Sequence, residues 1–365
     1  MISYQSIDGP RACERTELSD VIQLVDSIMR SGSEQSVLTD YPLVYEDHNL
    51  DNVRIIKADN QVVSVVPFIP RQIELEGCEW TVGIISPTAT SPHHRRKGYA
   101  STCLQDCINL MDGKGIELSV LWTKVETFPF YESAGYCAVQ NQGYQYRCEK
   151  NDVHRFKNDG DEIVELELSR NPEWLESIQF MHQKEASHVV RRTKEYRYLF
   201  TLPEMKTLLA VRNGIPTAYL VVSQAVNKPG LIEGGGDENS LESLLHFVLQ
   251  GLGDTASITG YAYLTSSVLG NVLERKLASK RRIMDEAPMM IRINQKEKFI
   301  GKISKLIECK NQGRGWGLSH QDLMGMSRRD LTSVLFGRYG DGPVQPAERS
   351  ERFPLAFPIW LLDRS

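Results

Sequence analysis

Residues 88–101 read TATSPHHRRKGYAS, and we expect them to run from the end of a strand into the first turn of a helix. The first N–H groups of a helix lack an intrahelical partner, so together with the helix dipole they stabilise an anion placed there. Arg95, Arg96 and Lys97 add charged donors, and Gly98 lets a phosphate approach the backbone. This turn therefore predicts a pyrophosphate site, with a solvated basic turn at a helix start as the alternative.

Two common nucleotide-binding motifs do not fit this turn. No Gly-Lys-Ser or Gly-Lys-Thr follows it, as a P-loop requires, and the three glycines of a dinucleotide-binding turn are missing. Nucleotide hydrolysis and hydride transfer are therefore disfavoured as the activity of this chain.

The residues around the turn predict one mixed α/β domain that ends near residue 150. Apolar residues recur every three or four positions through 16–29 and again after Pro92, which is typical of helices that bury one face. Between them, two pairs of β-rich runs separated by turn residues indicate an antiparallel meander. The remaining expected elements are a buried strand at 118–122, a short helix at 130–134, and a closing hairpin of 136–139 with 144–148.

A charged segment, 151–162, is predicted to be a linker, and the order of elements after it repeats that of the first domain. Residues 151–286 are therefore interpreted as a degenerate repeat. Its helix start carries Asp237 and Glu238, whose carboxylates compete with phosphate for the same helix dipole. The expected elements are a helix around 174–186, a hairpin of 208–212 with 217–222, a strand at 231–236 and a helix at 240–252.

From residue 287 the pattern indicates a third, smaller part. It contains a strand at 289–293, a helix with apolar residues on one face, and a second helix through 331–336. We therefore predict a small α+β C-terminal domain at 287–365, and an α/β fold class with mixed sheets for the whole chain.

The composition excludes several classes of protein. The 365 residues include 42 Lys and Arg against 47 Asp and Glu, a net charge of −5 that gives no global positive field for nucleic acid. The longest uncharged stretch, 255–273, is interrupted by glycine and polar residues, and the N-terminal segment carries many charges. We expect neither a membrane span nor a secretory signal, and therefore a cytoplasmic protein.

The cysteines and histidines do not indicate a metal site. Seven cysteines is an odd number and none forms a CxxC pair, so neither a disulfide framework nor a zinc site is expected. Cys103 and Cys107 lie four residues apart on an expected helix with no matching pair elsewhere, which favours packing. His93 and His94 precede the basic run, where exposure is the simpler interpretation. We predict no metal cofactor.

Two motifs resemble those of the GCN5-related N-acetyltransferases, the GNAT superfamily. Arg95-x-x-Gly98-x-Ala100 after a strand resembles the family's acetyl-coenzyme A signature, (Q/R)xxGx(G/A), and the sequence FYESAGY at 130–136 is similar to its second motif. The order of parts also resembles the branch typified by the enhanced-intracellular-survival (Eis) aminoglycoside acetyltransferase. That branch joins an active GNAT domain, a degenerate one and a sterol-carrier-like C-terminal domain.

The resemblance implies a GNAT domain at 1–150, a degenerate GNAT-like domain at 151–286 and the sterol-carrier-like domain at 287–365. It implies acetyl-coenzyme A as the acyl donor, bound to the first domain. The backbone of 88–90 would pair with the pantetheine arm like an added strand, and the basic turn would cradle the pyrophosphate. The implied cofactor-binding residues are Thr88, Ala89, Thr90, Arg95, Arg96, Lys97, Gly98, Tyr99, Ala100 and Ser101.

The resemblance also places Tyr131 near the departing sulfur. A neutral amine attacks directly, and the leaving thiolate needs a proton. A tyrosine with a pKa of about 10 can donate to a thiolate whose acid has a pKa of about 8.5. We predict Tyr131 as the general acid, with a core aromatic that caps a short helix as the alternative role.

Three further groups are candidates for handling the acceptor amine. The apolar segment 353–362 should be docked rather than exposed. In the resembling branch the terminal carboxylate reaches the active site, so Ser365 or Asp363 is predicted to orient or deprotonate the amine; a tail end in solvent is the alternative. Asp26 and Glu126 are candidates for recruiting a cationic substrate, against simple solvation of both carboxylates.

The sequence thus predicts an N-acetyltransferase that acts on a small-molecule or peptide amine, with no nucleic acid or membrane partner; a homo-oligomer stays open. The alternative is a non-catalytic acyl-coenzyme A sensor or a lipid-binding protein. Tyr131→Phe separates the two, because a sensor has no need of a hydroxyl near the sulfur.

Overall fold

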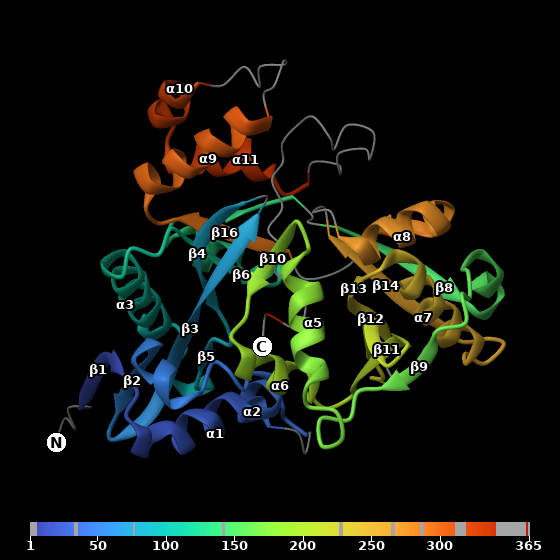
Figure 1. Cartoon of the computed structure of the whole chain (residues 1–365). Helices are drawn as coiled ribbons and strands as arrows, with labels where there is room; N and C mark the ends of the chain where they lie inside the picture. Colours follow the sequence, from blue (N-terminus) through green and yellow to red (C-terminus); the bar gives the residue numbers. More distant parts are fainter. Residues whose placement is uncertain are drawn as a thin grey trace.

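Two mixed β-sheets with helices on both faces organise the computed structural model of this chain (Figure 1). The structure describes residues 6–32, 36–75, 77–140, 143–225, 229–263, 267–284, 288–310, 319–340 and 363. Within that part of the chain, no helix is both long enough and apolar enough to cross a membrane.

The first sheet has the strand order β1-β2-β3-β4-β6-β16-β7, and β5 and β10 also pair with β3. The predicted meander is confirmed, since β2, β3 and β4 pair in antiparallel fashion. Asp59 and Asn60 take positive φ angles at the turn between β2 and β3. The strands are β1 (Ile7–Ala12), β2 (Val53–Ala58), β3 (Gln61–Leu75), β4 (Cys78–Ile85), β5 (Ala89–Thr90), β6 (Leu118–Trp122), β7 (Cys137–Ala138), β10 (Ser187–Val190) and β16 (Met289–Ile293).

Alternate residues of the first sheet bury into two separate clusters, one on each face. Helix α1 (Leu18–Met29) and the short α2 (Val37–Asp40) cover one face. Helix α3 (Tyr99–Gly113) and the short α4 (Phe128–Glu132) cover the other. The predicted helical periods are confirmed: the apolar face of α3, which includes Leu104, Cys107 and Met111, is buried against the sheet.

The second sheet repeats the strand directions of the first. Its order, read as β9-β11-β12-β13-β14-β8-β15, is antiparallel at every step except the parallel pair β13 and β14. In the first sheet the parallel pair, β4 and β6, stands at the same position. The strands are β8 (Gly143–Glu149), β9 (Glu162–Glu165), β11 (Met205–Arg212), β12 (Ile215–Ser223), β13 (Gly230–Gly236), β14 (Ser257–Tyr263) and β15 (Arg281–Ile283).

The helices of the second sheet follow the same plan. Helices α5 (Trp174–Gln183) and α6 (Thr193–Phe200) pack on one face, in the positions that α1 and α2 hold on the first sheet. Helices α7 (Glu238–Gln250) and α8 (Val268–Leu277) pack on the other face, as α3 and α4 do. The equivalent of the β4-to-α3 turn is therefore the β13-to-α7 turn.

The predicted closing hairpin of the first domain is wrong, because its two runs belong to different sheets. Strand β7 pairs with β16, whereas β8 lies between β14 and β15. The sixth strand of the first sheet, β16, comes from the segment that follows the second sheet in the sequence. The sixth strand of the second sheet, β8, comes from the end of the first half. Boundaries near 150 and 286 consequently cut across both sheets. The hairpin prediction assumed that β-rich runs adjacent in the sequence pair with each other. The local sequence of such a run does not specify which strand it pairs with.

The C-terminal segment does not build an α+β unit of its own in the described part of the chain. Its predicted strand is β16, which completes the first sheet. The predicted helices are present as α9 (Lys296–Lys310) and α11 (Arg328–Phe336), with α10 (His320–Gly325) between them. All three lie together at the top of Figure 1, and Phe299 packs 6.4 Å from Trp80 between ring centroids. They form a helical cover over the first sheet.

Strand β10 joins the two halves. Its residues Ser187–Val190 belong to the second half of the chain but pair with Gln72–Leu75, the far end of the long strand β3. Figure 1 shows β10 and α5 standing between the two sheets.

Candidate functional site

The backbone after β4 presents an open edge. Strands β4 and β6 pair in parallel only from Val82 to Ile84. Beyond that point the chain bends, and Ala89 and Thr90 pair with β3 on one side, opposite Val65 and Ser64. In the described residues no strand pairs with the other side of β5, although the Thr90 carbonyl accepts a hydrogen bond from Arg95 Nε at 3.3 Å. An extended partner therefore has room to add there.

The basic turn ends at an uncapped helix. Arg96 and Gly98 both have positive φ, 62° and 85°, and α3 begins at the next residue, Tyr99. Gly98 is the N-cap and offers no side-chain acceptor, and the first turn of α3 contains no acidic residue. A Cβ at Gly98 would meet no atom within 4 Å, so the backbone angle rather than crowding favours glycine there.

The charges of this turn face solvent. Arg95, Arg96, Lys97 and Gly98 are all exposed, while Thr88, Tyr99 and Ala100 are half-buried. The α3 start therefore offers free N–H groups, the positive end of a helix dipole and three cationic side chains at one place. This arrangement can bind an anion of high charge.

Tyr131 lies at the bend that follows β4. Its side chain is 8% exposed, and burial raises the pKa of its hydroxyl; the Thr88 hydroxyl beside it partly offsets that rise in pKa. Thr88 Oγ1 is buried and makes no hydrogen bond of normal geometry. The ring of Tyr131 packs edge-on against Phe130 and Tyr136, with centroids 4.7 and 6.1 Å apart. The structure thus brings Tyr131 and Thr88 together, with the phenol protonated at neutral pH.

The other residues near the turn have packing roles. Cys107 donates from Sγ to the Val66 carbonyl at 3.1 Å, and burial raises the pKa of its thiol well above the usual value. Burial also raises the pKa of Cys103, to about 12. His94 stacks on Tyr99 with ring centroids 6.2 Å apart. Among the described residues, no group of three His, Cys, Asp or Glu side chains is arranged to hold a metal ion.

The two acidic candidates lie in different settings. Asp26 caps α2, since its Oδ1 accepts from the Val37 N–H at 2.6 Å and its Oδ2 from Ser36 Oγ at 2.8 Å. It also lines an open cavity of about 800 Å³ along α1, a helix that packs against β5. Glu126 is exposed in the short helix Val125–Thr127 before α4. Asp26 therefore stabilises the start of α2, a role that the spacing of residues in 16–29 did not predict.

Position 363 is docked far from solvent. The Asp363 carboxylate is 0% exposed and accepts from Arg191 Nε and Nη2, both at 2.7 Å, and from Arg71 Nη2 at 3.3 Å. Arg191 also donates to both oxygens of Glu233, at 2.9 and 2.6 Å. Ser365 and the apolar segment 353–362 lie outside the described residues.

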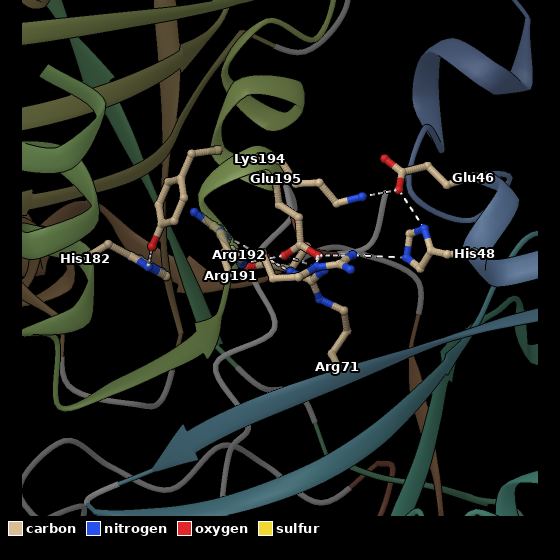
Figure 2. Close-up of polar contacts among 10 residues, drawn as sticks. Glu46, His48, Arg71, His182, Arg191, Arg192, Lys194 and Glu195 are labelled. Atoms are coloured by element: carbon tan, nitrogen blue, oxygen red, sulfur yellow. Dashed lines mark hydrogen bonds and ion pairs between the residues drawn. The ribbon is translucent and has the colours of Figure 1, made fainter. Parts of the chain in front are cut away.

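This ion cluster sits where the two halves meet. Figure 2 shows Arg71 reaching from its strand toward Arg191 and Glu195, with Glu46 and His48 approaching from the other side. Arg71 Nη1 lies 3.1 Å from Glu195 Oε2. Sequence reasoning missed Arg71, Arg191 and Glu233; a signal was available only for Glu233, the one charged residue in the glycine-rich strand β13.

The equivalent turn of the second half is capped by its own side chain. Asp237 is the N-cap of α7, and its Oδ1 accepts from the Ser240 N–H at 3.0 Å. Glu238 follows in the first turn. A carboxylate therefore already occupies the helix start that is free in α3.

Residues 10–139 match the model of a protein family described as "Acetyltransferase (GNAT) domain". A search of curated protein sequences gives no match.

Solved structures resemble much more of the chain. A probable N-acyltransferase from Enterococcus faecalis V583 is 17% identical, with a TM-score of 0.62 over 82% of this chain and 75% of that one. A GCN5-related N-acetyltransferase from Anabaena variabilis is 15% identical, with a TM-score of 0.62 over 84% and 75%. Eis1 from Mycobacterium abscessus is 12% identical, with a TM-score of 0.56 over 82% and 76%. At these identities the likeness shows a shared fold, and it extends across both halves.

Proposed function

Since residues 10–139 form a GNAT acetyltransferase domain and the protein is an acyltransferase, we propose that it moves an acetyl group from acetyl-coenzyme A to the nitrogen of an amine. One observation carries this proposal: the open edge of β5, the uncapped basic start of α3 and the Tyr131 hydroxyl meet at one bend of the chain. A small-molecule or peptide amine is the acceptor class.

The donor would lie along this bend. Its pantetheine arm adds to the free edge of Thr88–Thr90 through main-chain hydrogen bonds. Its pyrophosphate binds the N–H groups of Tyr99, Ala100 and Ser101, and the side chains of Arg95 to Lys97 add charge-assisted contacts. The thioester then points toward Tyr131, at the end of the arm opposite the phosphates.

The reaction is one displacement of the coenzyme A thiolate by the amine, and the only other steps are proton transfers. The neutral amine nitrogen attacks the thioester carbonyl carbon, the C–S bond breaks, and the Tyr131 hydroxyl donates its proton to the leaving thiolate. The proton lost by the nitrogen passes to solvent, and Tyr131 is reprotonated from solvent. Because burial raises the pKa of Tyr131, the phenol is protonated across the neutral range and holds the proton that this step needs.

We further propose that the second half is a degenerate GNAT-like domain, as in the Eis-like arrangement, and that it binds no coenzyme A. The repeated strand directions support the first statement, and the Asp237 cap supports the second. The cavity along α1, which Asp26 lines, is the candidate acceptor site. Glu126, exposed in the short helix before α4, is a second candidate carboxylate for recruiting the cation. Whether Ser365 contributes a carboxylate stays a prediction.

The test is acetyl-coenzyme A turnover with a panel of amines, followed by thiol release and by mass spectrometry of the product. Tyr131→Phe should lower turnover at least about a hundredfold while leaving donor affinity nearly unchanged. Tyr198→Phe, which removes an exposed hydroxyl on α6, is the matched control and should turn over normally. Full activity of Tyr131→Phe would refute the general-acid role, and donor binding without turnover on any amine would favour a sensor.

A further inference from the structure

The second half contains a cavity beside its β13-to-α7 turn, the equivalent of the basic turn of the first half. Its volume is about 640 Å³. It lies between α5, the β13-to-α7 turn at Gly236 and Asp237, and the start of α8 at Val268. The second half therefore has a hollow beside a helix start that carries carboxylates in place of basic residues.

The walls of this cavity are mainly apolar. Phe180 and Ile215 both line it and are 59% and 64% exposed, so each leaves a large apolar surface uncovered. Met181, Pro216 and Val268 line the interior. A hollow whose exposed surface is mainly apolar, with polar groups placed among the apolar ones, is typical of a small-molecule site.

One carboxylate inside the cavity lacks a cationic partner. Glu185 is 7% exposed, and its two oxygens share a single donor, the Val268 N–H, at 3.1 and 3.4 Å. Over the described chain, no Lys, Arg or His side chain forms an ion pair with it. A buried carboxylate in apolar surroundings is costly unless a positive charge accompanies it. Burial accordingly raises the pKa of Glu185 to about 7, and the negative charge of Glu233 on β13 adds to the rise.

The remaining charges at the cavity also favour a cation. Glu176 of α5 and Asp237 at the α7 start both line it, against one ammonium group, that of Lys184. The Lys184 Nζ lies over the Phe180 ring, 4.0 Å from its centroid. Three carboxylates thus face one cation, and that cation already contacts an aromatic face.

We propose that this cavity binds a hydrophobic amine, whose ammonium group contacts Glu185 and whose apolar body packs against Phe180, Met181 and Ile215. The site is separate from the donor and acceptor sites of the first half. Its occupation does not depend on acetyl transfer, so the two proposals fail independently.

The test is calorimetry of 2-phenylethylamine on the full chain without acetyl-coenzyme A. Glu185→Gln, which keeps the size of the side chain, should weaken binding about tenfold or more, because it removes a charge-assisted contact. Phe180→Ala should weaken binding several-fold by removing an apolar wall. Asp254→Asn changes an exposed carboxylate outside the lining of the cavity and should leave binding unchanged.

Two further measurements sharpen the result. The neutral 2-phenylethanol, of the same shape, should bind at least about tenfold more weakly than the amine. Near pH 7 the amine should release a fraction of a proton, measured in buffers of different ionisation enthalpy, and Glu185→Gln should abolish that release. Equal binding of alcohol and amine, unaltered affinity in Glu185→Gln, or no amine binding at millimolar concentration would overturn the proposal.

Discussion

The starts of α3 and α7 occupy equivalent places in two sheets with the same strand directions, yet their electrostatics are opposite. At α3 the N-cap is Gly98, and the preceding residues Arg95 to Lys97 are all cationic. At α7 the N-cap is Asp237, whose carboxylate accepts from the Ser240 N–H in the first turn of the helix. Both helices carry the same dipole, so the dipole by itself does not make an anion site.

What separates the two turns is which group satisfies the first N–H donors. A side chain that caps the helix accepts from a first-turn N–H group itself, whereas a glycine N-cap leaves these N–H groups available to a ligand. The second half also holds a buried carboxylate, Glu185, which has no ion-pair partner among the described residues. One backbone plan thus carries a candidate anion site in one half and a cavity with an acidic lining in the other.

The largest effect is expected from placing at the start of α3 the same N-cap residue that α7 has, an aspartate. Gly98→Asp places a carboxylate where we propose the pyrophosphate, and it puts a side chain at a φ of 85°. We expect acetyl-coenzyme A binding, measured by calorimetry, to be lost. Gly214→Asp is the matched control: its φ is 77° and its Cβ position is also open, but it lies in the β11–β12 turn. Unchanged donor affinity in Gly98→Asp would place the anion site elsewhere.

The next effect concerns the junction that holds the two halves in one arrangement. Arg191→Met leaves the carboxylates of Asp363 and Glu233 buried without their shared cation. Breaking a buried ion pair on one side costs about 3–5 kcal/mol. Urea unfolding should show a loss of stability of this size. In Arg170→Met, which removes an exposed partner of Glu167, the change should stay below about 0.5 kcal/mol. Similar stabilities of the two variants would mean that the cluster does not hold the halves together.

The smallest of the three effects is a pH dependence in the second half. The pKa of Glu185 is raised by burial from 4.5 to about 7, so the folded chain binds a proton that the unfolded chain has lost between these values. The free energy of unfolding therefore falls as pH rises from 4.5 to 7, by up to about 3 kcal/mol. Above pH 7 the whole of this destabilisation is present.

Glu185→Gln removes this ionisation and should flatten the dependence. Urea unfolding at pH 5 and pH 8 should show the variant gaining on the unmodified protein at the higher pH. Glu167→Gln, an exposed change, is the control and should track the unmodified protein. A variant that gains equally at both pH values would show that Glu185 is not the group that titrates.

Much of this protein follows from local sequence. The apolar spacing in 16–29 predicted α1, and the Asp59-Asn60 turn predicted the β2–β3 hairpin. The acidic pair Asp237 and Glu238 predicted a helix start that disfavours phosphate. The basic turn and Gly98 marked the candidate anion site. Each of these features depends on residues within about four positions of one another, and backbone propensity, capping and helical period act over that range.

Only the tertiary structure decided which strands pair and which charges meet. The exchange of β8 and β16 joins residues more than one hundred positions apart, as in the pairing of Gln145 with Tyr261 and of Val120 with Ile291. The cluster of Arg71, Arg191 and Asp363 likewise draws on three distant segments. Apolar strands are chemically alike, so their partners are chosen by how all the faces bury together, and a buried charge finds its partner only once those faces are in place.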